Sequence, residues 1–454
     1  MSDSYNNKLK NDKRNLFVAK AMIIFITLQP LLDLITTYTR VVLGSNITPG
    51  MVIRFAVLAI GAIYIIIRSL EKPNKKYFLY LILLALFFII NLIISYIYKP
   101  EFSLMRELTA VGKLVYVIEM FVVYILVFKD LKKVNLINKY FPLNIIISQI
   151  ITNAVMIISA VTETGIEAYD GVLKSGNSGW FYAANELGTL AAICFPVLLW
   201  MALRQKEFRN RVISWVAVIT STYTLLTIGT KVGYLAIILT LIMAVITLIV
   251  EAIVNFRKSE KINYRNIASI VLFSAVFTLG TPLYPVAQNT NSHVELINSK
   301  EPLIDEATNE PIEENKSEIF TQVIYSSRDV FQDDFVTQYD KANVWQKVFG
   351  LGFAGNYVGT PKIIERDFHD IFYQYGILGF VLIMIPVFYY GIQLVIKMLK
   401  DLTNQFKIKY VMLLSALAIG FGVAFIAGHS LMAPAVSSYI ALLFGYLVVD
   451  LKIE

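Results

Sequence analysis

The strongest constraint on the fold is a series of hydrophobic runs that are each long enough to cross a lipid bilayer. A membrane-spanning helix needs about 20 mostly apolar residues, and such runs recur along nearly all of the 454 residues. Hydrophobic residues make up 57% of the chain and charged residues only 16%, whereas a soluble domain usually carries about 25% charged residues. We therefore predict an all-α polytopic membrane protein.

The hydrophobic runs predict about twelve transmembrane helices. The two runs on either side of Lys231, in "LLTIGTKVGYLAII", can also be interpreted as one long helix, which would invert the orientation of every later span. The predicted spans cover residues 16–38, 47–68, 76–98, 107–128, 141–162, 185–203, 211–229, 231–254, 267–287, 370–396, 409–428 and 433–450.

Basic residues in the connecting segments predict how the bundle is oriented, because Lys and Arg concentrate on the cytoplasmic side of membrane proteins. They are dense before the first span and in alternate loops, and sparse in the loops between, one of which holds Lys231 alone. This alternation requires a turn at Lys231, so we predict twelve helices with both termini cytoplasmic. The N-terminus has no small-residue cleavage site, and we expect the first helix to stay as an uncleaved anchor. The net charge of +7 reflects this orientation, and nucleic-acid binding is not expected.

One predicted external segment is much longer than the other loops and divides the chain into three parts. We predict nine helices in residues 1–287, a large extracytoplasmic loop at 288–367, and helices ten to twelve in 368–454. The loop has seven basic and fourteen acidic residues, a formal charge of −7, and its first half has the composition of a flexible stretch. Its second half shows apolar residues at three- and four-residue steps, which predicts an amphipathic helix over about 327–349.

Two residues near this loop are candidates for chemistry. Arg328 falls in the first turn of the amphipathic helix, where the helix dipole favours an anion, so it needs either a carboxylate or a phosphate as partner. His369, in "RDFHDIFYQYGILG", falls in the first turn of the tenth helix, above a strip with Gly376 and Gly379 where another element can approach closely. A structural histidine at the membrane boundary is the alternative interpretation.

Further polar residues are predicted at the same side of the membrane. Asp33, Arg54 and Lys113 lie within spans near their outer ends, where charges mark either a function or a buried pair, and both interpretations remain open. The other candidates stand at a helix start and at an outward turn: Asn185 and Glu186 in "SGNSGWFYAANELG", and His429 in "GHSLMAP".

The order of four motifs resembles a known family. The segments "GNSGWFYAANELG", "TIGTKVGYLA", "SSRDVF" with "VFGLGF", and "RDFHDIFYQYGILG" resemble, in this order, the O-antigen ligase and Wzy-type polysaccharide polymerase family of bacterial envelope proteins. The resemblance covers roughly residues 175–380. It implies a glycosyltransferase in the bacterial cytoplasmic membrane that uses undecaprenyl-pyrophosphate-linked glycans on the outer face, with a glycan acceptor, membrane lipid, and possible flippase and chain-length regulator partners.

The resemblance also implies roles for particular residues. His369 corresponds to the catalytic centre, where a histidine accepts the proton of the attacking hydroxyl, and Asp370 is expected to orient or charge the imidazole. Arg328 and Lys231 correspond to donor phosphate recognition. The family more often has Arg in place of Lys231 and Asn in place of Asp370, which weakens a bidentate phosphate grip at position 231. The remaining predicted substrate-binding residues are Arg366, Arg54, Asn185, Glu186 and His429. No cofactor and no metal are implied.

Two other classes of protein fit some of these features. A flippase or exporter of lipid-linked glycans would also have about twelve spans with buried charges, but it would not need a long external loop with a helix. A scaffold for envelope assembly would need the loop and not His369. Within the enzyme interpretation, polymerase and ligase remain open because they differ only in the acceptor.

Overall fold

The computed structural model describes residues 2–71, 74–169, 174–298, 328–400 and 406–453, and within them the fold is all-α. An isolated β-bridge joins Glu167 and Asn177. The helices run in the order α1 (Ser2–Thr27), α2 (Gln29–Val41), α3 (Pro49–Ser69), α4 (Lys75–Tyr98), α5 (Leu104–Lys133), α6 (Ile137–Val161), α7 (Ala184–Arg204), α8 (Phe208–Ile228), α9 (Lys231–Arg257), α10 (Tyr264–Gly280), the short 3₁₀ helix η2 (Thr281–Leu283), α11 (Pro285–Asn298), α13 (Arg328–Lys341), α14 (Val344–Phe349), α15 (Asp367–Lys400), α17 (Ile408–Ile426) and α18 (Pro434–Asp450).

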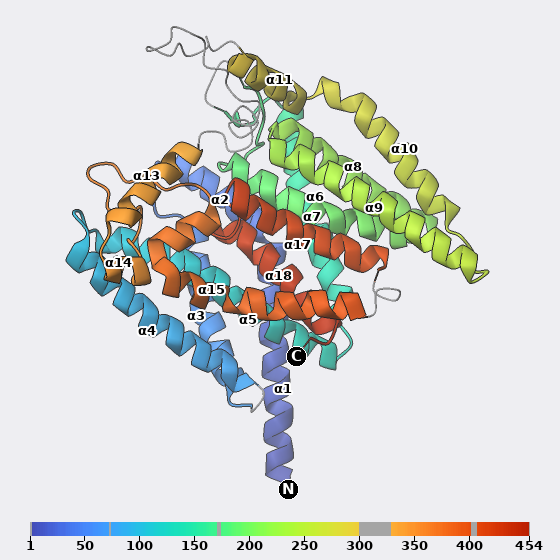
Figure 1. Cartoon of the computed structure of the whole chain (residues 1–454). Helices are drawn as coiled ribbons and strands as arrows, with labels where there is room; N and C mark the ends of the chain where they lie inside the picture. Colours follow the sequence, from blue (N-terminus) through green and yellow to red (C-terminus); the bar gives the residue numbers. More distant parts are fainter. Residues whose placement is uncertain (1, 72–73, 170–173, 299–327, 401–405, 454) are drawn as a thin grey trace.

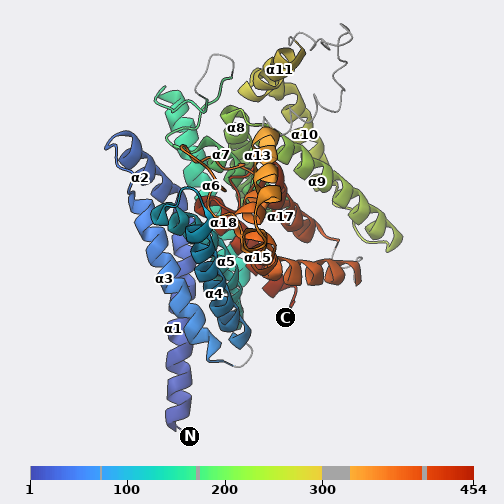
Figure 2. The same ribbon diagram turned by 60° about the vertical axis from the view of Figure 1, so that its left-hand side comes forward.

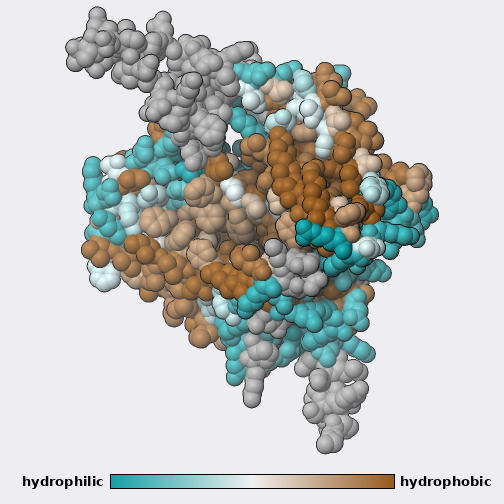
Figure 3. Space-filling model, turned by 45° about the vertical axis from the view of Figure 1, so that its right-hand side comes forward, coloured by the Kyte–Doolittle hydropathy of each residue, from teal (hydrophilic) through white to brown (hydrophobic). Residues whose placement is uncertain are grey.

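The described part of the chain confirms a polytopic membrane protein. It contains ten helices that are long and apolar enough to span a bilayer, or eleven if the bent pair α1–α2 is one span, and α18 is a shorter apolar helix. Each of the twelve predicted spans overlaps one or more helices, although twelve crossings remain a prediction. The first covers parts of α1 and α2, and the ninth covers parts of α10, η2 and α11. The face seen in Figure 3 carries a broad hydrophobic band bordered by hydrophilic residues.

The centre of the bundle is formed by α5, α7 and α18. The apolar side chains of α7 and α18 are almost all buried, and α18 packs most extensively against α5. Helices α3 and α4 flank this centre on one side and α8, α9 and α10 on the other (Figures 1 and 2). Both termini lie at the end opposite α13 (Figure 1).

The first predicted span is not one straight helix. Helices α1 and α2 meet at an angle of 52°, and Pro30 stands at the start of α2. Proline has no backbone N–H, and its ring clashes with the carbonyl four residues earlier, so the helix bends here. The predicted span over 16–38 therefore covers parts of two helices, α1 and α2, and their crossing of the membrane as one span remains a prediction.

The turn before Lys231 is confirmed. Helix α8 ends at Gly229 in the left-handed conformation, and Thr230 caps α9 by accepting a hydrogen bond from the Gly233 amide. The two runs are therefore separate helices, and the single long helix is excluded.

The external segment begins with more helix than its composition predicted. Helix α11 extends to Asn298, into the stretch expected to be flexible, and residues 299–327 lie outside the described structure. The predicted amphipathic helix over 327–349 is two helices, α13 and α14. The side chain of Asn343 accepts a hydrogen bond from the Gln346 amide and caps the N-terminus of α14. Because an N-cap residue is not helical itself, the helix breaks at Asn343.

Helix α15 is interrupted at Gly376, whose backbone is not helical (φ 68°, ψ −176°). The break frees two carbonyls, and the amides of Leu351 and Gly352 donate to Tyr373 and Gln374. A Cβ on Gly376 would lie 2.5 Å from the Gly350 nitrogen, and one on Gly379 would lie 2.5 Å from the Phe87 ring. The close approach expected at Gly376 and Gly379 is confirmed. The break at Gly376 separates the first turns of α15 from the rest of the helix.

A buried ion pair between α4 and α5 holds the segment that follows α14. Lys99 Nζ lies 2.5 Å from Glu107 Oε1 and donates to the Phe353 carbonyl at 2.6 Å, while Glu107 Oε2 accepts from the Phe353 amide at 2.8 Å. The external segment is thus attached directly to the helix bundle.

Candidate active site

Residues far apart in the sequence meet at the α13 end of the bundle, around the carboxylate of Glu365. Arg328, the first residue of α13, places Nη2 3.3 Å from Glu365 Oε2. His429, in the turn between α17 and α18, places Nε2 3.8 Å from the same oxygen. Glu365 therefore joins two of the predicted substrate-binding residues.

Backbone geometry fixes this junction. Glu365 and His429 both have positive φ, 62° and 59°, which is uncommon for residues with a side chain. A Cβ on Gly428 would overlap the Glu365 carbonyl, so the two turns touch. The buried Asp367 carboxylate accepts hydrogen bonds from the Ser430 and Leu431 amides at 2.9 and 2.6 Å, locking the turn before α18 onto the start of α15.

His369 lies on the neighbouring side of this start. Its ring is partly buried, with its centroid 5.4 Å from that of Phe425, and its Nδ1 is a buried atom without a hydrogen-bond partner among the described residues. Arg366 is buried over the same Phe425 ring, donates to the Phe425 carbonyl and to Gln332 of α13, and interacts electrostatically with His369. Phe425 thus brings His369 and Arg366 together.

The Asp370 carboxylate binds the backbone of the segment that precedes α15. Its carboxylate accepts hydrogen bonds from the Ile364 and Arg366 amides at 3.0 and 3.1 Å and from the Gln374 side chain at 3.3 Å. These contacts hold the segment that carries Glu365 and Arg366, so Asp370 supports the site. A direct effect on the imidazole remains a prediction.

The charges at the junction change each other's titration. The Glu365 carboxylate raises the pKa of His429 above its usual value, against the opposing effect of burial. In turn, His429 and then Arg328 lower the pKa of Glu365. An ion pair stabilises the charged form of both partners. Glu365 and His429 therefore keep their charges over a wider range of pH than either group would alone.

A cavity of about 470 Å³ lies nearby, between α2, α3, α5, α6, α7 and the start of α18. At its floor, Arg54 donates to Asp33 at 2.5 Å and to Gln29 at 2.7 Å. Two of the three intramembrane charges predicted from the sequence therefore form a pair, and both line the cavity.

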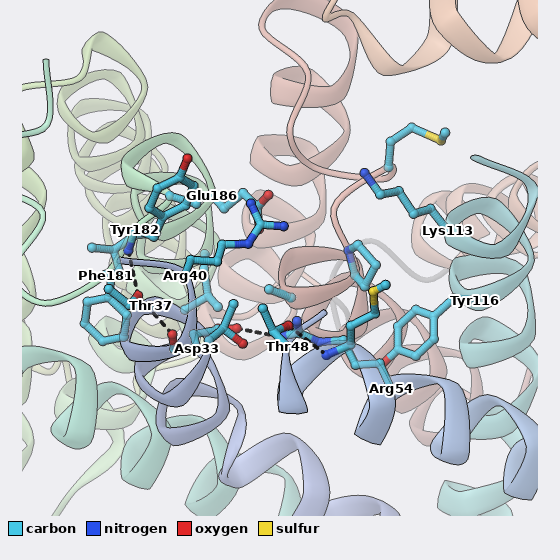
Figure 4. Close-up of a pocket in the computed structure, with 18 of the residues that line it drawn as sticks. Asp33, Thr37, Arg40, Thr48, Arg54, Lys113, Tyr116, Phe181, Tyr182 and Glu186 are labelled. Atoms are coloured by element: carbon cyan, nitrogen blue, oxygen red, sulfur yellow. Dashed lines mark hydrogen bonds and ion pairs between the residues drawn. The ribbon is translucent and has the colours of Figure 1, made fainter. Parts of the chain in front are cut away.

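The upper walls of the cavity carry charges of both signs. Glu186 lines it from the start of α7, Arg40 lies over the Tyr182 ring at 5.3 Å, and Lys113 reaches in from the opposite wall (Figure 4). Glu186 interacts electrostatically with Asp33, Arg54, Lys113 and His429. Through His429, the cavity is coupled to the Glu365 junction.

Two predicted residues lie apart from these groups. Asn185 is exposed and is not among the residues that line the cavity. Lys231, at the start of α9, is partly buried and near enough to Lys174 for their charges to repel. The loop carrying Lys174 is tied down by Asn289 of α11, whose amide donates to Ser175 and Gly229.

Two residues that join the others were not predicted from the sequence. Glu365 was counted only as an acid of the loop, although it directly precedes Arg366, and Phe425 was only one apolar residue of a predicted span. Among the described residues, no group of three or more His, Cys, Asp or Glu side chains is placed to hold a metal ion.

The family model described as O-antigen ligase like membrane protein matches residues 15–454. No curated protein matches the chain.

Proposed function

Because this chain belongs to the family of O-antigen ligase like membrane proteins, whose members join glycans in the membrane, we propose that it transfers a lipid-pyrophosphate-linked glycan to a hydroxyl of a second glycan. The reaction runs on the outer face of the bacterial cytoplasmic membrane and builds a cell-surface polysaccharide. The observation that carries this proposal is the meeting of Arg328, His429 and Glu365 beside His369 and Arg366.

The roles follow from the chemistry of the transfer. The acceptor oxygen attacks the anomeric carbon, the bond from that carbon to the phosphate oxygen breaks, and the pyrophosphate leaves with the bonding electrons. His369 accepts the hydroxyl proton, and the unpartnered Nδ1 supports this, because a buried polar atom without a partner costs about 1–3 kcal/mol that a substrate group would relieve.

Fixed cations stabilise the charge that develops on the leaving group. Arg328 is the main candidate, since its Nε is a buried atom without a hydrogen-bond partner among the described residues while Nη2 bonds Glu365. A phosphate would complete the guanidinium in the bidentate way that arginine favours. Arg366, His429 and Lys231 add positive charge around the same end of the bundle, with Lys231 farther away.

A reconstituted transfer assay tests the proposal. Wild-type protein in vesicles is mixed with the lipid-pyrophosphate oligosaccharide pool of the host, and new glycosidic bonds are read from glycan length. We expect His369→Ala and Arg328→Ala to lose product, while Lys341→Ala, a charge removed at the exposed other end of α13, keeps it. Wild-type protein that moves labelled lipid across the vesicle but forms no glycosidic bond would instead be a flippase.

A further inference from the structure

The cavity with Asp33 and Arg54 at its floor has no role in the chemistry described above. Resting on the proposed transfer reaction, we propose that this cavity binds the acceptor glycan as a neutral, hydroxyl-bearing sugar, while the pyrophosphate of the donor binds at the Arg328 end. A transferase needs two substrates, and the structure separates two polar regions that differ in chemistry.

The size and lining of the cavity suit a sugar. Its volume of about 470 Å³ lies within the range of about 300–1,000 Å³ typical of small-molecule sites. Sugar hydroxyls both donate and accept hydrogen bonds, and the lining offers acceptors in Asp33 and Glu186 and donors in Arg40 and Lys113. A tyrosine, Tyr116, adds flat apolar surface for the C–H face of a sugar.

The same lining disfavours a diphosphate. Arg54 is the deepest cation, and its Nη2 already bonds Asp33 at 2.5 Å and Gln29 at 2.7 Å. A second carboxylate, that of Glu186, faces the same space. At this floor a diphosphate would have to displace Asp33 from Arg54 and lie beside two like charges, and these two carboxylates oppose the attraction of Arg40 and Lys113.

The lining also disfavours an acyl chain. Apolar side chains such as Leu58, Phe181 and Leu190 line part of the cavity, but charged and hydroxyl side chains reach it from α2, α3, α5, α6 and α7. Covering them with hydrocarbon would remove them from water without new hydrogen bonds, which is strongly unfavourable for each buried charge. A polar occupant avoids this cost.

The position of the cavity is compatible with transfer. Met432, in the turn between α17 and α18, and Pro434, the first residue of α18, line the cavity, and the same turn carries His429, which pairs with Glu365. A sugar in the cavity and a pyrophosphate at Arg328 are therefore separated by this one turn.

Cysteine protection tests the assignment on the full-length protein. Cys194 is buried, so wild-type protein serves as the unreactive background. Thr109→Cys places a reporter thiol in the cavity, where the Thr109 hydroxyl donates to the Met105 carbonyl of its own helix. Phe425→Cys places a matched reporter beside His369 and Arg366. The probes are undecaprenyl pyrophosphate and the free oligosaccharide released from the host lipid-linked pool by mild acid.

We expect free oligosaccharide, at about ten times its dissociation constant, to slow modification of the Thr109→Cys thiol about tenfold by simple occupancy. Undecaprenyl pyrophosphate should leave that thiol unchanged and slow modification of the Phe425→Cys thiol. Adding Glu186→Gln to Thr109→Cys should lower the affinity for oligosaccharide about tenfold or more, because the hydrogen-bond acceptor loses its charge. At the same oligosaccharide concentration, protection of the thiol should then fall to about twofold or less. If that variant does not fold, Lys113→Gln, on an exposed side chain, takes its place.

Protection of the Thr109→Cys thiol by undecaprenyl pyrophosphate and not by oligosaccharide would overturn the proposal, as would no protection by either probe. The transfer assay reads the proposed function separately. If wild-type protein forms no glycosidic bond but oligosaccharide still protects the cavity thiol, the transferase is wrong and the sugar site stands. If transfer occurs without protection of the cavity thiol, the sugar site is wrong and the transferase stands.

Discussion

The buried ion pair of Lys99 and Glu107 allows a quantitative test of how the external segment is held. Lys99 Nζ is fully buried and Glu107 nearly so, with side-chain exposures of 0% and 3%, and burial lowers the pKa of Lys99 against the opposing effect of Glu107. Lys99→Met keeps a long side chain but removes the charge, the bond to the Phe353 carbonyl and the partner of Glu107.

The expected magnitude follows from the burial. Removing one partner of a buried pair strands the other charge and costs about 3–5 kcal/mol. Since about 1.36 kcal/mol corresponds to a factor of ten, local opening of the segment should become more frequent by about two to four orders of magnitude. The segment leads from α14 towards α15, so transfer activity should fall as well.

Amide hydrogen exchange in detergent measures this opening. Three amides report it directly, because Leu351 and Gly352 donate to carbonyls of α15 and Phe353 donates to Glu107. The double variant Lys99→Met with Glu107→Gln should recover part of the protection, since no charge is left stranded. Arg106→Ala, which removes the hydrogen bond that the exposed Arg106 donates to Tyr357, is the matched control. The reasoning would be refuted if, in folded Lys99→Met, the protection of these three amides stayed within about tenfold of wild type. Such a change is smaller than the one expected from the cost of a stranded charge.

Other contacts give three further predictions. The stability supplied by protonated His429 should be fully present below its ordinary pKa, about 6.5, and lost as pH rises through its raised folded pKa, whereas the Glu365 contribution is lost as pH falls through its lowered pKa. In thermal unfolding, a stability difference of up to about 1 kcal/mol between wild type and His429→Gln should therefore disappear at high pH. A difference that stays constant from mildly acidic to alkaline pH would contradict the ion pair. Gly350→Ala should destabilise the protein by at least about 1–3 kcal/mol, because its Cβ would overlap the Gln374 carbonyl at a φ of 103°; a melting temperature equal to that of wild type would show that the contact relaxes freely. Asn343→Ala should cost about 0.5–2 kcal/mol by removing the cap of α14, and proteolysis between α13 and α14 at the wild-type rate would argue against it.

Hydrophobic length and charge alternation predicted the membrane helices well, because both depend on local sequence. The turn at Gly229 was predicted from the sparse loop around Lys231 and is present. The bend before Pro30 and the cap at Asn343 had local signals, a proline and an Asn three residues before Gln346, that the apolar periodicity of the surrounding runs outweighed.

The contacts that build the candidate site had no local signal. Glu365 meets His429 across 64 positions, and Glu107 meets Phe353 across 246. Each pairing depends on how distant helices pack and on backbone conformations such as the positive φ of Glu365. Sequence patterns identified residue types that carry chemistry, but the structure was needed to show that Arg54 pairs with Asp33 and that Asp370 bonds backbone amides.

A single-turnover measurement with donor-loaded His369→Ala is the most direct test of whether His369 accepts the proton. The variant and wild type are each bound to the lipid-pyrophosphate oligosaccharide, and a single turnover is followed after an acceptor is added. We predict that His369→Ala binds the donor as wild type does, through Arg328, yet forms no new glycosidic bond on the wild-type timescale. A wild-type rate of transfer by His369→Ala would contradict this prediction and place the proton acceptor elsewhere.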